Sequence, residues 1–368
     1  MLHDGRLFGR TFRGFTLQWH LTNACPEACR HCYDRSTPTP LSLPQALDVL
    51  RQLTAFCARH DVAGGVCFTG GDPLLYPHFF DLYRAAVDAA LDVSILGNPT
   101  GEAELAALCA IGRPRSYQVS LEGREACNDA IRGDGHYGRV MAFLDRLHAH
   151  GVRTHVMLTL HRENLGEAEG LAAALAGKAD RFLYNRLAQV GGGASLAQPT
   201  REEYAAFMRR WFLLARVHPF VGFKDNLLNI ALYHFGRRLR GGCTGAGCGA
   251  AFNFVALLPD GEVHACRKFP SPLGNVLASG LEAIYASSAA QRYRVGCREC
   301  YLCPIRNSCG GCLAVGYGMG RDIFEEPDPH CFFEERYEVV AAAARPAPGG
   351  VPAGERAAAD DAGDGVLP

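Results

Sequence analysis

Long apolar segments are absent from this sequence. No run approaches the ~20 apolar residues that a membrane-spanning helix requires, and the opening stretch MLHDGRLFGRTFRGF has no apolar run followed by a small-residue cleavage site. Net charge is also nearly absent, because 37 Lys and Arg residues balance 38 Asp and Glu residues. The sequence therefore predicts a cytoplasmic protein that has neither a membrane nor a nucleic acid as its partner.

Cysteine, in contrast, is abundant, with 16 residues in a chain of 368. In a reducing compartment so many thiols do not form a disulfide scaffold, and core packing does not require them. The rest of the amino-acid composition is ordinary for a globular protein, with 48% hydrophobic and 20% charged residues. Ligation of a metal or a metal cluster is the leading explanation for the cysteines.

Short β-branched or aromatic segments alternate with helical patterns between residues 15 and 216. This alternation predicts a parallel α/β fold with functional groups at the carboxyl ends of its strands. By itself the alternation does not separate an open barrel from a doubly wound sheet. The expected strands are 15–22, 65–70, 92–98, 116–123, 153–160 and 181–188, and the expected helices are 43–60, 79–90, 102–111, 138–150, 166–176 and 201–216.

The other parts of the chain differ in character from this alternating region. Residues 1–14 form an N-terminal extension, and residues 217–242 predict a bridging helix. Residues 243–335 predict a loop-rich, cysteine-rich domain, which would need inorganic ligation to hold it together. Residues 343–368 lack aromatic residues and periodicity, so we expect a disordered tail.

Three cysteines, Cys25, Cys29 and Cys32, stand close together in ACPEACRHCY, directly after the first expected strand. A structural zinc site is closed by four ligands and disulfides use pairs, so three thiols suit a site with one open coordination position. The spacing can wrap a loop around a [4Fe–4S] cluster, so that three irons are bound by thiolates and the fourth is free to bind a small molecule. Zinc or chance is the alternative interpretation.

This loop resembles the hallmark of the radical S-adenosylmethionine (radical SAM) enzymes, which is CxxxCxxC after strand one with an aromatic residue behind the last cysteine. GGDP after the second strand is similar to the GGEP-type motif of that family, with Asp72 in place of the commoner glutamate. LGNP, VSLEG and NDAIRG follow at the expected strand ends. A simple turn or a strand-end cap is the alternative for Gly70, Gly71 and Ser120. The resemblance implies a partial (β/α)6 barrel of the TIM type over 15–216, with S-adenosylmethionine (SAM) contacts from Tyr33, Gly70, Gly71, Asp72, Pro73, Asn98, Ser120 and Arg132.

The cysteine-rich region resembles the SPASM domain, an auxiliary-cluster module of radical SAM enzymes that mature peptides and proteins. Four thiolates per cluster would leave no position for a substrate, so such clusters are better suited to carrying electrons. A pair of four-cysteine zinc sites is the alternative. The resemblance implies one auxiliary [4Fe–4S] cluster on Cys243, Cys248, Cys266 and Cys312, and a second on Cys300, Cys303, Cys309 and Cys331, with Cys297 as a substitute ligand.

The resemblance also implies an activity. SAM would be cleaved reductively to a 5′-deoxyadenosyl radical that abstracts hydrogen from a ribosomally made precursor peptide, giving an oxidative modification or crosslink. An electron donor such as flavodoxin or ferredoxin would supply the reducing electron. The segments LQWHLTNAC, GGDPL and LGNP are most similar to thio(seleno)oxazole-modification maturases. Since few residues precede the first strand, a leader peptide would be recognised by a separate protein, by residues 217–240 or by the barrel mouth.

Three other classes compete with this interpretation. A protein-side-chain maturase of the sulfatase type commonly has aspartate after the cysteine that is Cys266 here, where this chain has Arg267. A non-enzymatic iron–sulfur electron carrier would explain eleven ligating cysteines, but it has no need for an open three-cysteine site. A zinc-stabilised interaction module would explain the carboxyl-terminal region, but it gives no reason for GGDP.

Overall fold

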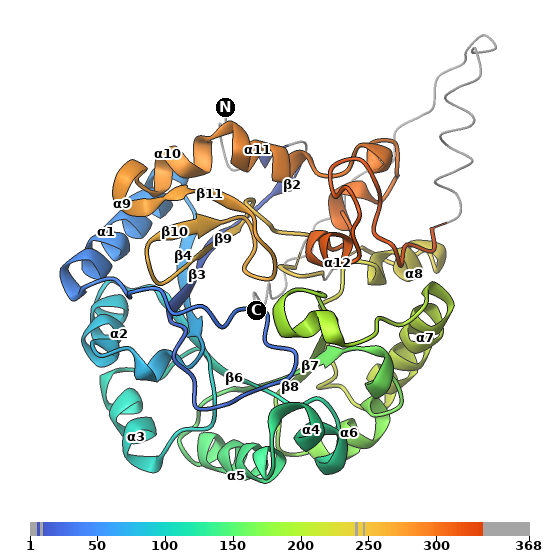
Figure 1. Ribbon diagram of the computed structural model, residues 1–368, viewed down its shortest axis with the longest axis horizontal. Coiled ribbons are helices and arrows are strands. Elements are labelled where there is room, and N and C mark those ends of the chain that lie inside the picture. The colour runs from blue at the N-terminus through green and yellow to red at the C-terminus, as the bar shows by residue number, and fades with distance from the viewer. Residues whose placement is uncertain (1–5, 8–9, 240–241, 246, 334–368) are drawn as a thin grey trace.

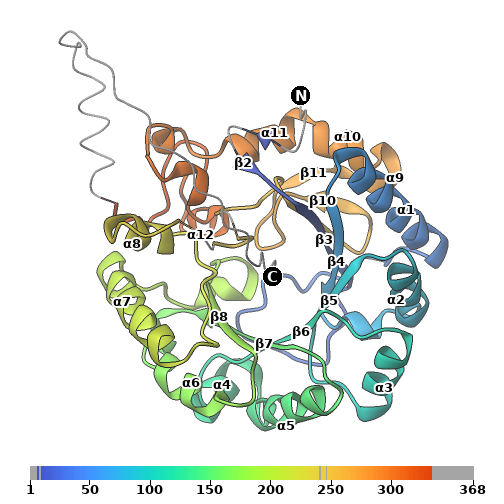
Figure 2. The same ribbon diagram turned by 180° about the vertical axis from the view of Figure 1, so that it is seen from behind.

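The computed structural model describes residues 6–7, 10–239, 242–245 and 247–333. The expected tail at 343–368 lies outside these residues. The described chain forms a curved sheet inside a ring of helices (Figure 1), and the view from behind shows the same ring (Figure 2). A short antiparallel pair, β1 (Arg6–Leu7) and β2 (Arg10–Thr11), precedes the main sheet. Within the described ranges, no helix is long and apolar enough to cross a membrane.

Six strands run parallel and lie side by side in chain order, as the alternation predicts. The parallel α/β fold is therefore confirmed. Several strands end earlier than expected, so the polar residues that follow them are loop residues at the carboxyl edge of the sheet. These strands are β3 (Gly14–Thr22), β4 (Ala63–Gly70), β5 (Asp92–Leu96), β6 (Ser116–Ser120), β7 (Thr154–Leu160) and β8 (Arg181–Arg186).

The helices between these strands cover the outer face of the sheet (Figure 1). They form where apolar residues recur at helical spacing, and α7 also has a complete capping box in which Thr200 and Glu203 bond to each other's backbone. The sequence did not predict α4, an eight-residue helix. The helices are α1 (Leu43–His60), α2 (Phe79–Asp88), α3 (Glu102–Ile111), α4 (Glu125–Arg132), α5 (His136–Ala149), α6 (Ala168–Leu175) and α7 (Arg201–Val217).

The carboxyl-terminal region contains more regular structure than the loop-rich domain that the sequence predicts. Strand β9 (Phe254–Leu257) pairs in parallel with β3, and β10 (Glu262–His264) and β11 (Pro272–Asn275) continue the sheet in antiparallel fashion. The nine strands thus have the order β11-β10-β9-β3-β4-β5-β6-β7-β8. The helices of this half are α8 (Leu228–His234), α9 (Val276–Ser279), α10 (Leu281–Ala286), α11 (Ser288–Val295) and α12 (Leu313–Gly318).

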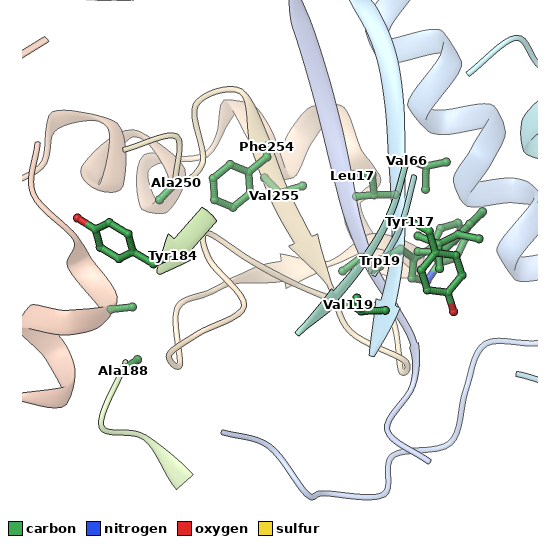
Figure 3. Close-up of a cluster of buried hydrophobic side chains, with 14 of the residues drawn as sticks. Leu17, Trp19, Val66, Tyr117, Val119, Tyr184, Ala188, Ala250, Phe254 and Val255 are labelled. Atoms are coloured by element: carbon green, nitrogen blue, oxygen red, sulfur yellow. The ribbon is translucent and has the colours of Figure 1, made fainter. Parts of the chain in front are cut away.

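A single large core connects the two halves of the chain. Figure 3 shows Leu17 of β3, Val66 of β4 and Val255 of β9 among its buried side chains. All four residues of β9 are buried. Their burial against β3 stabilises the junction, because each Å² of apolar area removed from water contributes about 25 cal/mol. The carboxyl-terminal half is therefore held against the barrel by a shared sheet and a shared core.

Candidate active site

A cavity of about 390 Å³ lies at the carboxyl ends of the parallel strands. Parallel α/β folds place their functional groups at this edge, because loops from several strands converge there. Asp72 and Pro73 are not among the residues that line the cavity. Nine of the residues expected at the site do line it: Cys25, Cys29, Cys32, Tyr33, Gly70, Gly71, Asn98, Ser120 and Arg132.

Gly70 and Gly71 hold the cysteine loop against the end of β4. The Gly71 amide donates to the carbonyl of Thr22 at 2.8 Å, and the Asp72 amide donates to the carbonyl of Ala24 at 2.8 Å. A Cβ at Gly71 would lie 2.3 Å from the oxygen of Ala24, and one at Gly70 would lie 2.1 Å from the oxygen of Thr22. Only glycine permits this backbone approach. The pair thus has a structural role, and its contact with SAM stays a prediction.

Asp72 acts behind the cavity wall. One carboxylate oxygen accepts from the Leu74 amide at 3.1 Å, which caps a short 3₁₀ turn, and the other accepts from Asn98 Nδ2 at 3.5 Å. The same Asn98 nitrogen lies 3.5 Å from Cys25 Sγ, and Tyr117 donates to the Asn98 carbonyl at 2.8 Å. Burial raises the pKa of Asp72. Asp72 therefore orients Asn98 toward the first cysteine of the loop.

Glu122, which sequence reasoning did not assign, is the centre of a buried ionic network beside the cysteines. Its carboxylate is fully buried and accepts from Arg132 Nε at 2.9 Å, from the Thr159 amide at 2.7 Å and from His31 Nε2 at 2.8 Å. The Arg132 guanidinium also lies 3.7 Å from Cys29 Sγ. The sequence does hold a signal for this network. Glu122 stands two residues after Ser120, and Arg132 follows ten residues further on.

This network keeps positive charge next to a cysteine thiol. Burial opposes ionisation of Glu122, but the charges and hydrogen bonds of Arg132 and His31 outweigh it and lower its pKa to about 2. Burial raises the pKa of Cys29, and Arg132 opposes that shift. Since a thiol must lose its proton to bind iron, Arg132 favours ligation at Cys29.

A glycine-rich segment after β8 packs against the same loop. The Gly192 amide donates to the carbonyl of Cys32 at 2.9 Å. A Cβ at Gly191 would lie 2.4 Å from the oxygen of Tyr33. The cysteine loop is therefore held from both sides by backbone contacts that leave no room for side chains.

The structure gathers the eight predicted auxiliary ligands into two groups. The thiols of Cys248 and Cys266 each interact electrostatically with those of Cys243 and Cys312. Burial raises the pKa of Cys248 to about 12 and that of Cys266 to about 11. The second group lines one small cavity: Cys300, Cys303, Cys309 and Cys331.

The grouping is the one that the resemblance implies, while the ligand assignment itself stays a prediction. Cys297 lies beside Cys300 and Cys248 at a third cavity, and its thiol donates to the Glu325 carbonyl at 3.2 Å. Within the described residues, no three His, Cys, Asp or Glu side chains are arranged to hold one metal ion. Sets of four soft thiolates suit iron–sulfur clusters, and the three-thiol set beside a cavity suits a cluster with an open position.

Arg186 of β8 links the cavity wall to both thiol groups. It is fully buried, and it donates to Asp225 at 2.7 Å and to both oxygens of Asp328 at 2.7 Å. Asp328 also accepts from the Cys312 amide at 2.7 Å, and its carbonyl accepts from the Cys331 amide at 2.9 Å. One buried arginine thus connects the barrel to segments of both auxiliary sets.

Fold and cavity together define an α/β-barrel protein with three cysteines at its cavity and two further groups of four cysteines. The chain matches the radical SAM superfamily over residues 19–175 and the iron–sulfur cluster-binding (SPASM) domain over residues 248–312. The chain thus contains a radical SAM domain and a SPASM domain, which confirms the resemblance, and these domains imply [4Fe–4S] clusters and SAM as cofactors.

Similar proteins include a maturase and a bacteriocin biosynthesis protein. The chain is 29% identical to mycofactocin maturase MftC of Mycobacterium ulcerans, covering 86% of this chain and 87% of the relative. It is 26% identical to the subtilosin biosynthesis protein AlbA of Bacillus subtilis, covering 82% of this chain and 68% of the relative. Among solved structures, Streptococcus suis SuiB bound to the precursor peptide SuiA superimposes with a TM-score of 0.67 at 14% identity, covering 87% of this chain and 76% of that one. This last likeness shows a shared fold.

Proposed function

We propose that this protein modifies a ribosomally made precursor peptide by radical chemistry. The observation that carries the proposal is the single cavity that contains the three cysteines of the loop together with the carboxyl ends of β4 to β8. The relatives named as a mycofactocin maturase and as a biosynthesis protein of the bacteriocin subtilosin support a peptide as substrate. When bound, a [4Fe–4S] cluster and SAM supply a 5′-deoxyadenosyl radical that removes hydrogen from an unactivated carbon.

The chain's own residues prepare the site for these groups. Cys25, Cys29 and Cys32 would hold the first cluster, and Arg132, fixed by Glu122, lowers the cost of a thiolate at Cys29. Asn98 and Ser120 line the cavity where SAM would lie. The glycine contacts at Gly71 and Gly192 hold the loop in place, so little reorganisation is needed when the cofactors bind.

The eight carboxyl-terminal cysteines would hold two closed clusters and pass electrons. A two-electron oxidation of a peptide needs an acceptor for the electron that the substrate radical gives up. A donor such as flavodoxin or ferredoxin would reduce the first cluster, and a separate leader-binding protein is an expected partner. We propose a cytoplasmic location, because this chemistry requires a reducing compartment.

The test uses protein that is purified and reconstituted without oxygen. It is incubated with SAM, a reductant and candidate peptides encoded by short reading frames beside the gene. We expect a peptide to lose mass in multiples of two hydrogens, with 5′-deoxyadenosine formed in the same reaction. If the peptide is uniformly deuterated, 5′-deoxyadenosine should gain deuterium. Unchanged peptides, combined with 5′-deoxyadenosine that stays free of deuterium, would rule out a peptide substrate.

A further inference from the structure

Two cationic side chains from the carboxyl-terminal half, Arg267 and Lys268, line the reaction cavity. They follow Cys266 directly, in the turn between β10 and β11. Arg267 Nη1 lies 3.4 Å from the hydroxyl of Thr69, at the carboxyl end of β4. The auxiliary half therefore contributes two positive charges to the wall of a cavity whose remaining lining comes from the barrel.

The other charged side chains of the cavity wall already have partners. Arg132 is paired with Glu122 and Glu27 with Arg139. Arg186 is paired with Asp225 and Asp328, and Arg35 donates to the carbonyls of Ala28 and Cys29. Among the described residues, the Thr69 hydroxyl is the hydrogen-bond partner of Arg267, and the Lys268 side chain makes no hydrogen bond or ion pair.

Asp34 is the carboxylate of the wall that could neutralise these cations. Its oxygens instead accept from Asn23 at 3.0 Å and from the amide and hydroxyl of Ser36 at 2.9 and 2.7 Å. No ion pair joins Asp34 to Arg267 or Lys268 within the described chain. The two cations therefore line the cavity without a carboxylate partner among the described residues, and burying charge without a partner is costly.

His20 supplies an independent sign of a missing ligand. It is 1% exposed and lines the cavity, and its Nε2 has no hydrogen-bond partner. Burial and the charge of Arg267 lower the pKa of His20 to about 3, so the ring is neutral and can donate one hydrogen bond. A buried polar atom without a partner, close to unpaired cations, points to an anionic acceptor in the cavity.

We infer that Arg267 and Lys268, with His20 beside them, form a carboxylate-binding site that selects peptide substrates carrying a free carboxylate. The planar guanidinium suits a carboxylate, which it can bind through two parallel hydrogen bonds. This inference rests on the proposed function, because it names a feature of the peptide. It also gives a role to Arg267 at the position where aspartate is common in sulfatase maturases.

A competing role is charge compensation for the neighbouring thiolates. Burial raises the pKa of the Cys312 thiol, and the nearby charge of Lys268 opposes that rise, while the Lys268 amide donates to the sulfur of Cys266. However, Lys224 already places a cation near Cys243 and is not part of the cavity wall. Charge compensation alone does not require Arg267 and Lys268 to lie in the cavity wall, where both of them lie.

The test measures binding to the reconstituted holoenzyme with SAM already bound, so that the carboxylate of SAM cannot account for the result. The probes are acetylated trialanine with a free terminal carboxylate, acetylated Ala-Asp-Ala amide with a side-chain carboxylate, and acetylated trialanine amide without charge. Calorimetry at constant ionic strength gives the three dissociation constants. We expect at least one charged probe to bind about tenfold or more tightly than the neutral one.

Variants locate that preference. Arg267→Gln and Lys268→Gln should each reduce the ratio of the dissociation constants of the neutral and charged probes towards one. Arg267→Lys should retain part of this preference because the positive charge stays. Arg216→Gln, on the exposed end of α7, is the matched control for loss of one positive charge and should keep the full ratio. Iron content and circular dichroism verify that each variant is folded and loaded.

Three results would overturn the inference. The first is that the wild type binds all probes with equal affinity, and the second is that the preference for a charged probe survives in both Arg267→Gln and Lys268→Gln. The third is that the variants shift the auxiliary-cluster reduction potential without changing the ratio of the dissociation constants of the neutral and charged probes. The last result would assign the two cations to charge compensation. Formation of 5′-deoxyadenosine by the wild type is measured separately, so failure of the proposed function is distinguished from failure of this site.

Discussion

The two cysteine regions of this protein differ in how they surround their thiols. The barrel loop places three cysteines at the wall of a 390 Å³ cavity, and one of them, Cys25, is exposed. The carboxyl-terminal half places eight cysteines in two compact groups, and Cys309 there is only 8% exposed. The first arrangement leaves a large space beside its thiols, whereas the cavity that Cys300, Cys303, Cys309 and Cys331 line has only about 20 Å³.

This difference supports a division of roles, in which we propose that the barrel loop binds the cofactor and the carboxyl-terminal half transfers electrons. An open cluster needs a rigid loop and neighbours that can contact a bound cofactor, and Gly71, Asn98 and Arg132 line the cavity where we propose that SAM binds. A closed cluster needs four thiolates, and the second region gathers two groups of four cysteines that would supply them. Each region also has one buried carboxylate–arginine network, centred on Glu122 in the barrel and on Asp328 in the carboxyl-terminal half.

The largest expected effect comes from removing a ligand of the open site. Cys29→Ala should abolish formation of 5′-deoxyadenosine and lower the iron content by about four atoms per chain, because a three-thiol set cannot lose one ligand and hold its cluster. Iron analysis and chromatography of the reaction measure both. Cys109→Ala, in α3 and without an assigned role, is the control that should retain both values.

Removing a ligand of a closed site should have a different outcome. Cys309→Ala should also lower the iron content by about four atoms per chain. Here the rate of peptide modification should fall most, because the electron acceptor is incomplete. The melting temperature should fall as well, since cluster binding helps to fold this region. An iron content equal to that of the wild type would remove Cys309 from the ligand set.

The two buried carboxylates allow a matched comparison. Glu122→Gln and Asp328→Asn should each destabilise the protein by about 3–5 kcal/mol, because each leaves a buried arginine without its full countercharge. Urea unfolding measures this effect. Glu125→Gln, exposed at the start of α4, should change the free energy of unfolding by less than about 0.5 kcal/mol. Only Glu122→Gln should also weaken SAM binding, and equal SAM affinities for both variants would contradict the division of roles.

The same carboxylate gives a pH dependence with a defined sign. The pKa of Glu122 is lowered from 4.5 to about 2 by Arg132 and His31, which outweigh the opposing effect of burial. Its contribution, on the order of 3 kcal/mol, is therefore present above pH 4.5 and is lost as the pH falls towards 2. The stability difference between wild type and Glu122→Gln should shrink over that range. Measuring both proteins in parallel cancels acid effects that they share, and a constant difference would contradict the low pKa.

The smallest expected effect concerns the backbone contact that fixes the loop. Gly71→Ala brings a Cβ within 2.3 Å of the Ala24 oxygen, so the loop must shift, at a cost of about 1–3 kcal/mol. The SAM dissociation constant should rise accordingly. Gly138→Ala in α5 meets no atom within 4 Å and should stabilise the helix by about 0.5–1 kcal/mol. If Gly71→Ala behaved like Gly138→Ala, the close approach would have no function.

Much of the barrel could be predicted because its signals are local. Helices α1 and α3 begin and end where their apolar periodicity indicates, and the six parallel strands follow from alternation. Strands β9 to β11 could not be found in this way, because each has only three or four residues within glycine- and cysteine-rich sequence. The pairing of β9 with β3, which attaches all three to the main sheet, depends on tertiary packing.

The site shows the same division between local and distant information. The loop cysteines and Gly71 were predictable from their spacing, and the structure gathers them at one cavity. The Glu122 network depends on residues from four separate segments, which meet only in the folded chain. Arg186 with Asp328 is a similar case, because 142 positions separate the two.

The most direct test of the central claim is the cleavage of SAM by the open three-thiol site. Protein reconstituted without oxygen to about twelve irons per chain, four for each of three clusters, is mixed with SAM and dithionite, and 5′-deoxyadenosine is quantified. The account predicts that the wild type forms 5′-deoxyadenosine and that Cys29→Ala, with about eight irons, forms none. Fully loaded wild type that leaves SAM intact, or a Cys29→Ala variant that still cleaves it, would contradict the account.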